Sequence, residues 1–217
     1  MSIDFTSQRK SYEQGKLLEN TLPDLPYPLL TKWIDDALQA DIDEPYAFSL
    51  ATCGADQRPS VRTLLMREIY AKGSDIVLVF YSNYDSQKGQ DLAQNPFAEA
   101  LFFWQKLERQ VRLAGRVARL SRADSQAYFE SRPKDSQLAA WVSAPQSGVV
   151  DSRETMAERF NALQDKFCAD VPLPEFWGGY TLTVDSVEFW QGRANRMHDR
   201  ICYKLGDNGW RYERLLP

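Results

Sequence analysis

Five short runs of apolar, β-branched and aromatic residues constrain the fold of this chain more than any other feature. They read "YAFSLATC", "PSVRTLLM", "DIVLVFYS", "FAEALFFW" and "RQVRLAGRVARL". Turn-forming stretches such as "GADQR" and "KGS" separate some of these runs from their neighbours. Runs of this length joined by tight turns predict an antiparallel meander that closes into a barrel.

Helices are expected around these strands. Apolar residues recur at helical spacing in "PLLTKWIDDALQA" from Pro28, and "SQKGQDLAQNP" predicts a short helix ended by Asn-Pro. Ser121 and Asp124 resemble a capping box that opens a helix stopping before Pro133, and a second long helix is expected from near Asp151. The segments "GGYTLTVDSVEFW", "RMHDRICYKL" and "WRYERLLP" predict further strands.

We therefore expect a mainly β protein with flanking helices, of the α+β class. Residues 1–27 are polar and proline-punctuated, which predicts an arm that is mobile or lies over a neighbouring subunit. Residues 28–217 contain no internal repeat and no dividing linker, and they predict one domain.

Composition narrows the classes of function. The net charge of −4 argues against a general nucleic-acid binder, although a few convergent arginines can still hold a small anion. No apolar run reaches the roughly 18 residues that a membrane helix needs, and the start lacks a secretory signal, so a cytoplasmic location is expected. The odd number of widely spaced cysteines favours structural thiols and no metal site.

The sequence "RMHDR" contains the only histidine, His198, between two arginines. If this segment is a strand, Arg196, His198 and Arg200 project from one face as an array of hydrogen-bond donors, which suits an anionic ligand. The alternative is a solvated strand edge whose charges prevent pairing with other chains. The pattern by itself leaves both possibilities open.

Two other clusters of polar residues suggest anion binding. Tyr128 and Arg132 lie four residues apart on one helix face, and Ser136 follows shortly after, so the three could hold a phosphate. A second cluster combines Arg62 and Arg67 on one predicted strand with Lys88 on the predicted short helix. The spacing of five puts the two arginines on opposite strand faces unless a bulge or the strand end intervenes. Each cluster is also compatible with ordinary surface charge.

Several motifs are absent from the sequence. It contains no G-x-G-x-x-G and no P-loop pattern, so neither a Rossmann dinucleotide site nor a nucleotide P-loop is predicted. A single histidine leaves little from which to build a catalytic zinc site or a Ser-His-Asp triad. An enzyme of this composition is expected to take its reactivity from an organic cofactor.

The motifs "RPKDSQLAAWVSAPQS" and "VEFWQGRANRMHDR" closely resemble the pyridoxine (pyridoxamine) 5′-phosphate oxidase family, and the likeness runs from about Arg9 to the final "RLLP". The resemblance implies a split β-barrel homodimer with FMN at the subunit interface. It also implies oxidation of pyridoxine 5′-phosphate or pyridoxamine 5′-phosphate to pyridoxal 5′-phosphate, with oxygen as acceptor and hydrogen peroxide as product.

The resemblance also implies roles for individual residues. Arg196 and His198 are the implied catalytic residues, beside the pyridine ring of the substrate. The implied substrate-binding residues are Arg9, Lys10, Ser11, Tyr12, Arg67, Tyr128, Arg132, Ser136, Arg196, Met197 and His198. The implied FMN-binding residues are Arg62, Thr63, Leu64, Leu65, Met66, Arg67, Tyr81, Ser82, Gln87, Lys88, Gln110, Gln146, Ser147, Trp190 and Arg200.

Two positions depart from the family pattern. Arg67 stands where the family most often has Lys, which replaces a point charge by a planar fork. Gln87 stands in "QK" where the family commonly has Arg-Lys, and the loss of that cation predicts weaker FMN binding, by roughly 1.5–3 kcal/mol.

The sequence is also compatible with other functions. A non-catalytic carrier of flavin or pyridoxal phosphate could use the same barrel, and so could a split-barrel flavoenzyme that acts on a different substrate. The phosphate-binding set and the Arg196–His198 pair disfavour both. A barrel that binds single-stranded nucleic acid ranks last because of the acidic net charge.

Overall fold

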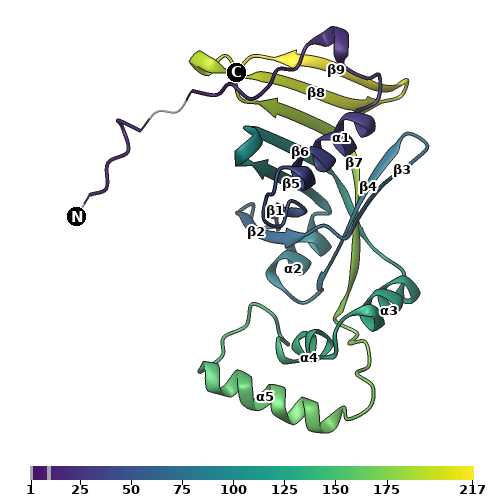
Figure 1. The fold of residues 1–217 in the computed structure, drawn as a ribbon. Coiled ribbons are helices and arrows are strands. Elements are labelled where there is room, and N and C mark those ends of the chain that lie inside the picture. The colour runs from purple at the N-terminus through teal and green to yellow at the C-terminus, as the bar shows by residue number, and fades with distance from the viewer. Residues whose placement is uncertain (1, 9–10) are drawn as a thin grey trace.

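The computed structural model describes residues 2–8 and 11–217, so the expected arm residues Arg9 and Lys10 lie outside the described residues. Figure 1 shows a tall sheet with helices at its sides and lower end. The strands are β1 (Ala47–Cys53), β2 (Pro59–Leu65), β3 (Glu68–Lys72), β4 (Asp75–Asn83), β5 (Phe97–Trp104), β6 (Arg109–Arg119), β7 (Trp177–Gln191), β8 (Asp199–Gly206) and β9 (Gly209–Leu215). The α-helices are α1 (Pro26–Gln39), α2 (Gln87–Gln94), α3 (Arg122–Ser131), α4 (Lys134–Val142) and α5 (Arg153–Lys166).

All the strand pairs are antiparallel, and the sheet order is β2-β1-β5-β6-β7-β4-β3, with β8 added to β7 and β9 to β8. Within the described residues β2 and β3 do not pair, so the sheet is an open, split barrel. The α+β class and the split barrel are therefore confirmed. The simple closed meander is wrong, because β1 pairs with β5 and β4 pairs with β7 across long stretches of chain.

The long strand β7 changes register against β6 between Ala114 and Gly115. A Cβ at Gly115 would lie 2.0 Å from the Thr183 carbonyl oxygen, so only glycine fits this close approach. The irregularity lets one strand serve two parts of the sheet: its first half pairs with β4 and its second half with β8.

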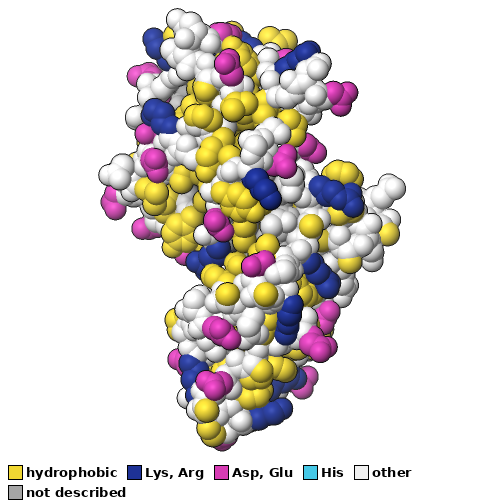
Figure 2. Space-filling model, turned by 90° about the vertical axis from the view of Figure 1, so that its right-hand side faces the viewer, with side chains coloured by type: hydrophobic (Ala, Val, Ile, Leu, Met, Phe, Trp, Pro, Cys, Tyr) yellow, Lys and Arg dark blue, Asp and Glu magenta, His cyan; other side chains and the backbone are white. Residues whose placement is uncertain are grey.

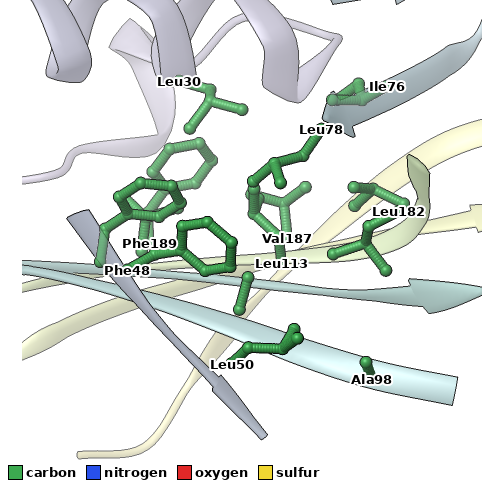
Figure 3. Packing of buried hydrophobic residues seen from close by; sticks show 14 of the residues in the cluster. Leu30, Phe48, Leu50, Ile76, Leu78, Ala98, Leu113, Leu182, Val187 and Phe189 are labelled. Carbon is green, nitrogen blue, oxygen red and sulfur yellow. The ribbon is translucent and has the colours of Figure 1, made fainter. Parts of the chain in front are cut away.

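The main core lies between the sheet and α1 (Figure 3). Pro26 occupies the start of α1, where a missing N–H costs nothing, and Leu30 and Trp33 turn their side chains into the barrel. Trp33 meets the Phe189 ring edge-on at 5.2 Å. Full burial of each such side chain contributes about 1.5–3 kcal/mol, so this cluster holds the barrel halves together.

A second, smaller core lies where α3 and α4 meet the start of β7. It contains Phe129, Leu138 and Trp177, and half-buried residues of α5 pack against it. No residue of α5 itself is buried. Figure 2 shows the result as a lower lobe below the body of the molecule, corresponding to α4 and α5 in Figure 1.

The segment that precedes α1 is bound along the barrel from residue 13 onward. The Glu13 and Gln14 amides donate to Oε2 of Glu108, and the Leu17 amide donates to Asp199 Oδ2 at 3.0 Å. The Leu17 side chain is buried. The division into an arm at residues 1–27 and one domain at 28–217 stays a prediction, but these contacts show where residues 13–17 lie.

Three local predictions were incomplete or wrong. The sequence patterns do not predict β3, which is only five residues long, or α4, because Pro133 ends one helix and also caps the next. The predicted strand "RMHDRICYKL" begins three residues late, at Asp199. Asn195 and Arg196 instead have positive φ angles of 56° and 61° and form a short turn.

Candidate functional site

A pocket of about 300 Å³ lies beside β4 and α3. Its lining residues come from the end of β2 and the β2–β3 connection, β4, α2, α3, the loop after α4 and the start of β7. They are Thr63, Leu64, Leu65, Arg67, Tyr81, Ser82, Asn83, Lys88, Tyr128, Arg132, Gln146 and Trp177. We call this the cationic pocket, because Arg67, Lys88 and Arg132 line it and none of the lining residues is acidic.

Lys88 is the most deeply placed of these cations. Its side chain is 8% exposed, and Nζ donates to Ser86 Oγ at 3.0 Å and to Gln146 Oε1 at 3.2 Å. Ser86 also caps α2 by accepting from the Gly89 amide, which fixes the position of Lys88 in the first turn. Burial, together with the positive charge of Arg62, lowers the pKa of Lys88 to about 8.

Aromatic rings support the Arg132 guanidinium. Its Cζ lies 4.6 Å from the centre of the Trp177 ring, while Tyr81 stacks on Tyr128 at 3.7 Å. The Arg132 Nη1 atom is buried and has no hydrogen-bond partner within the described structure. Such a donor is costly unless a ligand satisfies it, so an anion fits at this position.

The local sequence explains this arrangement. Ser121 Oγ accepts from the Asp124 amide and starts α3, as the capping pattern predicted. Tyr128 and Arg132 then lie one turn apart at the end of that helix, and Ser136 lies in the first turn of α4. Ser136 is half-buried and does not line the cationic pocket itself.

A second pocket, of about 790 Å³, lies at the far end of β7. We call it the arm pocket. It is lined by Gln8, Ser11, Tyr12, Arg193, Asn195, Arg196 and His198. Next to it the His198 ring lies 4.7 Å from the Trp190 ring, and Tyr12 meets both rings edge-on.

The hydrogen bonding of His198 fixes its tautomer. The Arg193 backbone N–H donates to Nδ1 at 3.1 Å, so a neutral ring carries its proton on Nε2. Burial and the charge of Arg196 lower the pKa of His198 below its usual 6.5. The ring can therefore be neutral near pH 7 and still donate a hydrogen bond from Nε2.

The predicted donor array of Arg196, His198 and Arg200 on one strand face does not form. Arg196 lies in the positive-φ turn, while Arg200 lies on β8 and pairs with Glu188 on β7, with Nε 2.9 Å from Oε1. Alternate side chains share one face only within a regular strand. Here the chain turns sharply at Asn195 and Arg196, before β8 begins at Asp199. Met197 is exposed beside this turn.

The structure thus divides the expected site residues into two sets. The first set lies at or near the cationic pocket and contains Arg62, Thr63, Leu64, Leu65, Met66, Arg67, Tyr81, Ser82, Gln87, Lys88, Tyr128, Arg132, Ser136, Gln146 and Ser147. The second set lies at or near the arm pocket and the end of β7 and contains Ser11, Tyr12, Gln110, Trp190, Arg196, Met197, His198 and Arg200. One copy of the chain does not bring the two sets together.

Five residues that line these pockets, namely Gln8, Asn83, Trp177, Arg193 and Asn195, were not among the expected site residues. Asn83 is 1% exposed, and its Nδ2 is an unpartnered buried donor beside the cationic pocket. Trp177 supports Arg132, and Arg193 joins the arm pocket to the N-terminal segment through a 2.9 Å bond to the Gly15 carbonyl. No sequence signal marks Asn83 or Arg193, whereas Trp177 could have been noticed as an aromatic residue beside two glycines.

The described residues contain neither a metal site nor a membrane-spanning helix. No group of three or more His, Cys, Asp or Glu side chains among them is placed to hold a metal ion. No helix in the described part of the chain is both long and apolar enough to cross a membrane.

Family models match most of the chain. Residues 34–167 match a model described as pyridoxamine 5′-phosphate oxidase. Residues 177–217 match the pyridoxine 5′-phosphate oxidase C-terminal dimerisation region. The second match contains Trp190, Arg196, His198 and Arg200, so a segment that lines the arm pocket also lies in a dimerisation region.

Curated relatives cover the full length. The chain is 55% identical over 220 residues to the pyridoxine/pyridoxamine 5′-phosphate oxidase of Psychrobacter cryohalolentis, with 100% of both chains covered. It is 50% identical to the protein of the same name from Acinetobacter baylyi, over 99% of this chain and 97% of the relative.

Solved structures share the fold. PhzG from Burkholderia lata, solved with tetrahydrophenazine-1-carboxylic acid, superposes with a TM-score of 0.85 at 26% identity, over 96% of this chain and 100% of that one. A pyridoxamine 5′-phosphate oxidase-related, FMN-binding protein from Nostoc punctiforme gives a TM-score of 0.67 at 18% identity, over 86% and 96% of the two chains.

Proposed function

The chain belongs to the pyridoxamine 5′-phosphate oxidase family, and from that membership we propose that it is an FMN-dependent oxidase that makes pyridoxal 5′-phosphate. Its substrates are pyridoxine 5′-phosphate and pyridoxamine 5′-phosphate. The alcohol and oxygen give the aldehyde and hydrogen peroxide; the amine, water and oxygen give the aldehyde, ammonia and hydrogen peroxide. FMN when bound supplies the hydride acceptor and passes the electrons on to oxygen.

The observation that carries this proposal is the cationic pocket. Arg67, Lys88 and Arg132 line one small cavity that has no acidic lining residue. FMN and the substrate each carry a phosphate monoester with about −1.5 to −2 charge near neutral pH, so binding both requires several cations in one place. A flavoenzyme whose substrate lacks a phosphate would need cations for the FMN phosphate alone.

The residues present also fit FMN as a cofactor. Lys88 is buried with no carboxylate partner among the described residues, and Asn83 and Arg132, which each hold an unpartnered buried donor, line the same cavity. We propose that Arg62, Lys88, Gln146 and Ser147 hold the cofactor, and that Arg67, Tyr128, Arg132 and Ser136 hold the substrate phosphate.

The arm pocket supplies the remaining groups. His198 offers a neutral ring with a donor at Nε2, and Arg196 offers a permanent positive charge, so together they orient the substrate's pyridine ring and stabilise charge that develops on it. Ser11 and Tyr12 lie on the N-terminal segment and line the same pocket, so closure of this segment over bound substrate would limit the access of water.

The active site is completed by two copies of the chain. The matched dimerisation region supports a homodimer. Because the cationic pocket and the arm pocket lie at opposite ends of β7, we propose that the cationic pocket of one copy faces the arm pocket of its partner, with FMN between them.

The test is a half-reaction without oxygen. The purified protein is loaded with FMN, pyridoxine 5′-phosphate is added anaerobically, and the visible flavin spectrum is recorded. Loss of flavin absorbance that returns on admission of air is the expected result. A spectral shift without bleaching would indicate a carrier that binds its ligand but does not oxidise it. No spectral response to pyridoxine 5′-phosphate or to pyridoxamine 5′-phosphate would overturn the proposal.

The fold similarity to PhzG defines a useful comparison substrate. Its ligand, tetrahydrophenazine-1-carboxylic acid, carries a carboxylate and no phosphate. If the cationic pocket serves a substrate phosphate, this compound should bleach the flavin far more slowly than pyridoxine 5′-phosphate does.

A further inference from the structure

We propose that Asp91 is a positioning residue that holds Arg62 in place for FMN through the hydroxyl groups of Thr52 and Ser60. This inference rests on the function proposed above. Asp91 lies on α2, is 4% exposed, and reaches across to β1 and β2. Its Oδ2 atom accepts from Thr52 Oγ1 at 2.7 Å and from Ser60 Oγ at 2.9 Å.

The same two hydroxyls accept hydrogen bonds from Arg62. Nη1 donates to Thr52 Oγ1 at 2.7 Å and to the Leu50 carbonyl at 3.1 Å, and Nη2 donates to Ser60 Oγ at 2.5 Å. Arginine can only donate and an ionised carboxylate can only accept. Each hydroxyl therefore points its single hydrogen at Asp91 and its lone pairs at Arg62, although the two hydroxyl oxygens also lie 3.2 Å apart.

Direct pairing between the two charged groups is weak by comparison. Arg62 Nη2 and Asp91 Oδ2 are 4.0 Å apart, beyond hydrogen-bond reach. Two of the five N–H groups of Arg62, at Nε and Nη2, have no hydrogen-bond partner among the described residues. The guanidinium is thus fixed in orientation and still has donors to offer a ligand.

Gln87 completes the network from one turn away on α2. Its Nε2 donates to Asp91 Oδ1 at 2.8 Å, so the other carboxylate oxygen is also held. This is the position where the resembled family commonly has arginine. We infer that Gln87 here serves Asp91 and not the FMN phosphate.

The electrostatics agree with a charged Asp91 near the cationic pocket. Burial alone would raise the pKa of Asp91, but the hydrogen bonds from Thr52, Gln87 and Ser60 and the charge of Arg62 outweigh it and lower the pKa. Arg62 in turn lowers the pKa of Lys88, so its charge is felt at the cavity wall. Arg62 is therefore the link between Asp91 and the cavity wall.

A double-mutant cycle on FMN affinity tests this. The apo forms of wild type, Asp91→Asn, Arg62→Gln and the double variant are titrated with FMN, and the dissociation constant is read from quenching of flavin fluorescence. We expect Asp91→Asn to raise the dissociation constant about tenfold in wild type and less than about twofold in the Arg62→Gln background. Gln90 is exposed on the same helix, so Gln90→Ala is the matched control and should leave the FMN dissociation constant unchanged.

A second variant covers the case in which Asp91→Asn fails to fold, which thermal unfolding of the apo protein detects. Ser60→Ala removes one of the two relaying hydroxyls at a half-buried site and should raise the FMN dissociation constant only when Arg62 is present. An Asp91→Asn penalty that is equally large without Arg62 would show a merely structural role and overturn the inference.

The remaining outcomes separate the two proposals. Tight FMN binding by wild type together with an unchanged dissociation constant in Asp91→Asn and Ser60→Ala would overturn the positioning role alone. Failure of wild type to bind FMN at all would overturn the proposed function and this inference together.

Discussion

Trp177 and Trp190 lie at opposite ends of the same strand, β7, and each belongs to a different pocket. Trp177 supports Arg132 in the cationic pocket, whereas Trp190 contacts His198 beside the arm pocket. A strand rises about 3.3 Å per residue, so the two rings are separated by roughly 40 Å of chain. A small substrate cannot bridge that length, which supports the proposal that a second copy of the chain completes the site.

Mixed dimers should recover activity from two inactive variants. Arg132→Ala damages the cationic pocket and His198→Asn damages the arm pocket, so each homodimer has two defective sites. A mixed dimer has one site built from two intact halves. Equal amounts of the two variants, exchanged at random, should therefore show about one quarter of wild-type turnover.

The control for this experiment is the double variant carrying both changes on one chain. When the double variant is mixed with wild type, each hybrid dimer has one defect in each of its two sites. The hybrid dimers should therefore add no activity. If the two single variants stay inactive after subunit exchange, which native mass spectrometry monitors, the site lies within one copy.

FMN affinity should fall as pH rises through about 8. Lys88 has a pKa of about 8 in the structure, and only its charged form pairs with the cofactor phosphate. The phosphate stays doubly charged over this range, so affinity is full below pH 8 and drops by about ten- to a hundredfold above it. Fluorescence titrations between pH 7 and 9.5 at constant ionic strength measure this.

Lys88→Gln is the matched control for the pH experiment. Its FMN affinity should be low at every pH, without the drop near 8. A wild-type affinity that stays flat to pH 9.5 would mean that Lys88 is not the phosphate partner.

The acid limb of the kcat/KM profile should lie below pH 6.5. The lowered pKa of His198 keeps the ring neutral as pH falls toward 6.5, and activity is lost only when Nδ1 becomes protonated and breaks the bond from the Arg193 amide. Arg196→Gln removes the repelling charge and should move the limb upward. The profile of kcat/KM against pH reports this for the free enzyme.

Amide substitutions of His198 test the assigned tautomer. Glutamine can place an N–H near the position of Nε2, while asparagine reaches only the position of Nδ1. We expect His198→Asn to lose about a hundredfold in turnover and His198→Gln to lose clearly less. The reverse order would mean that Nδ1 is the functional atom.

Arg193 should hold the N-terminal segment against the arm pocket. Its Nη1 donates to the Gly15 carbonyl at 2.9 Å, and its Nε lies 3.6 Å from Asp199 Oδ2. Arg193→Met should reduce the free energy that holds this segment on the barrel by about 1 kcal/mol, which should speed trypsin cleavage after Lys16 about fivefold. The same change should raise KM more than it lowers kcat. Arg211→Met, exposed on β9, is the control and should cleave at the wild-type rate.

The sequence predicted those parts of the fold that depend on local chemistry. The alternating burial of β1 and the cap formed by Ser121 follow from the period of a strand and from the donors at a helix start. The clustering of Tyr128 and Arg132 follows from helical spacing alone. Local rules failed at Pro133, which both ends α3 and begins α4, because one proline is compatible with either role.

The family motif implied a set of site residues but did not predict their arrangement. The alternation in "RMHDR" suggested one strand face, but positive φ angles at Asn195 and Arg196 turn the chain before β8 begins. The contacts of Asp91 and the pocket position of Asn83 could not be predicted from the sequence, because residues distant in the sequence form them.

The sequence by itself determined which side chains are available: the cations, the aromatic rings, the single histidine and the strands that carry them. Only the tertiary structure decided their grouping into two pockets at the two ends of β7. The physical reason is that pairing of β7 with β4 at one end and with β8 at the other is long-range, and no local preference encodes it.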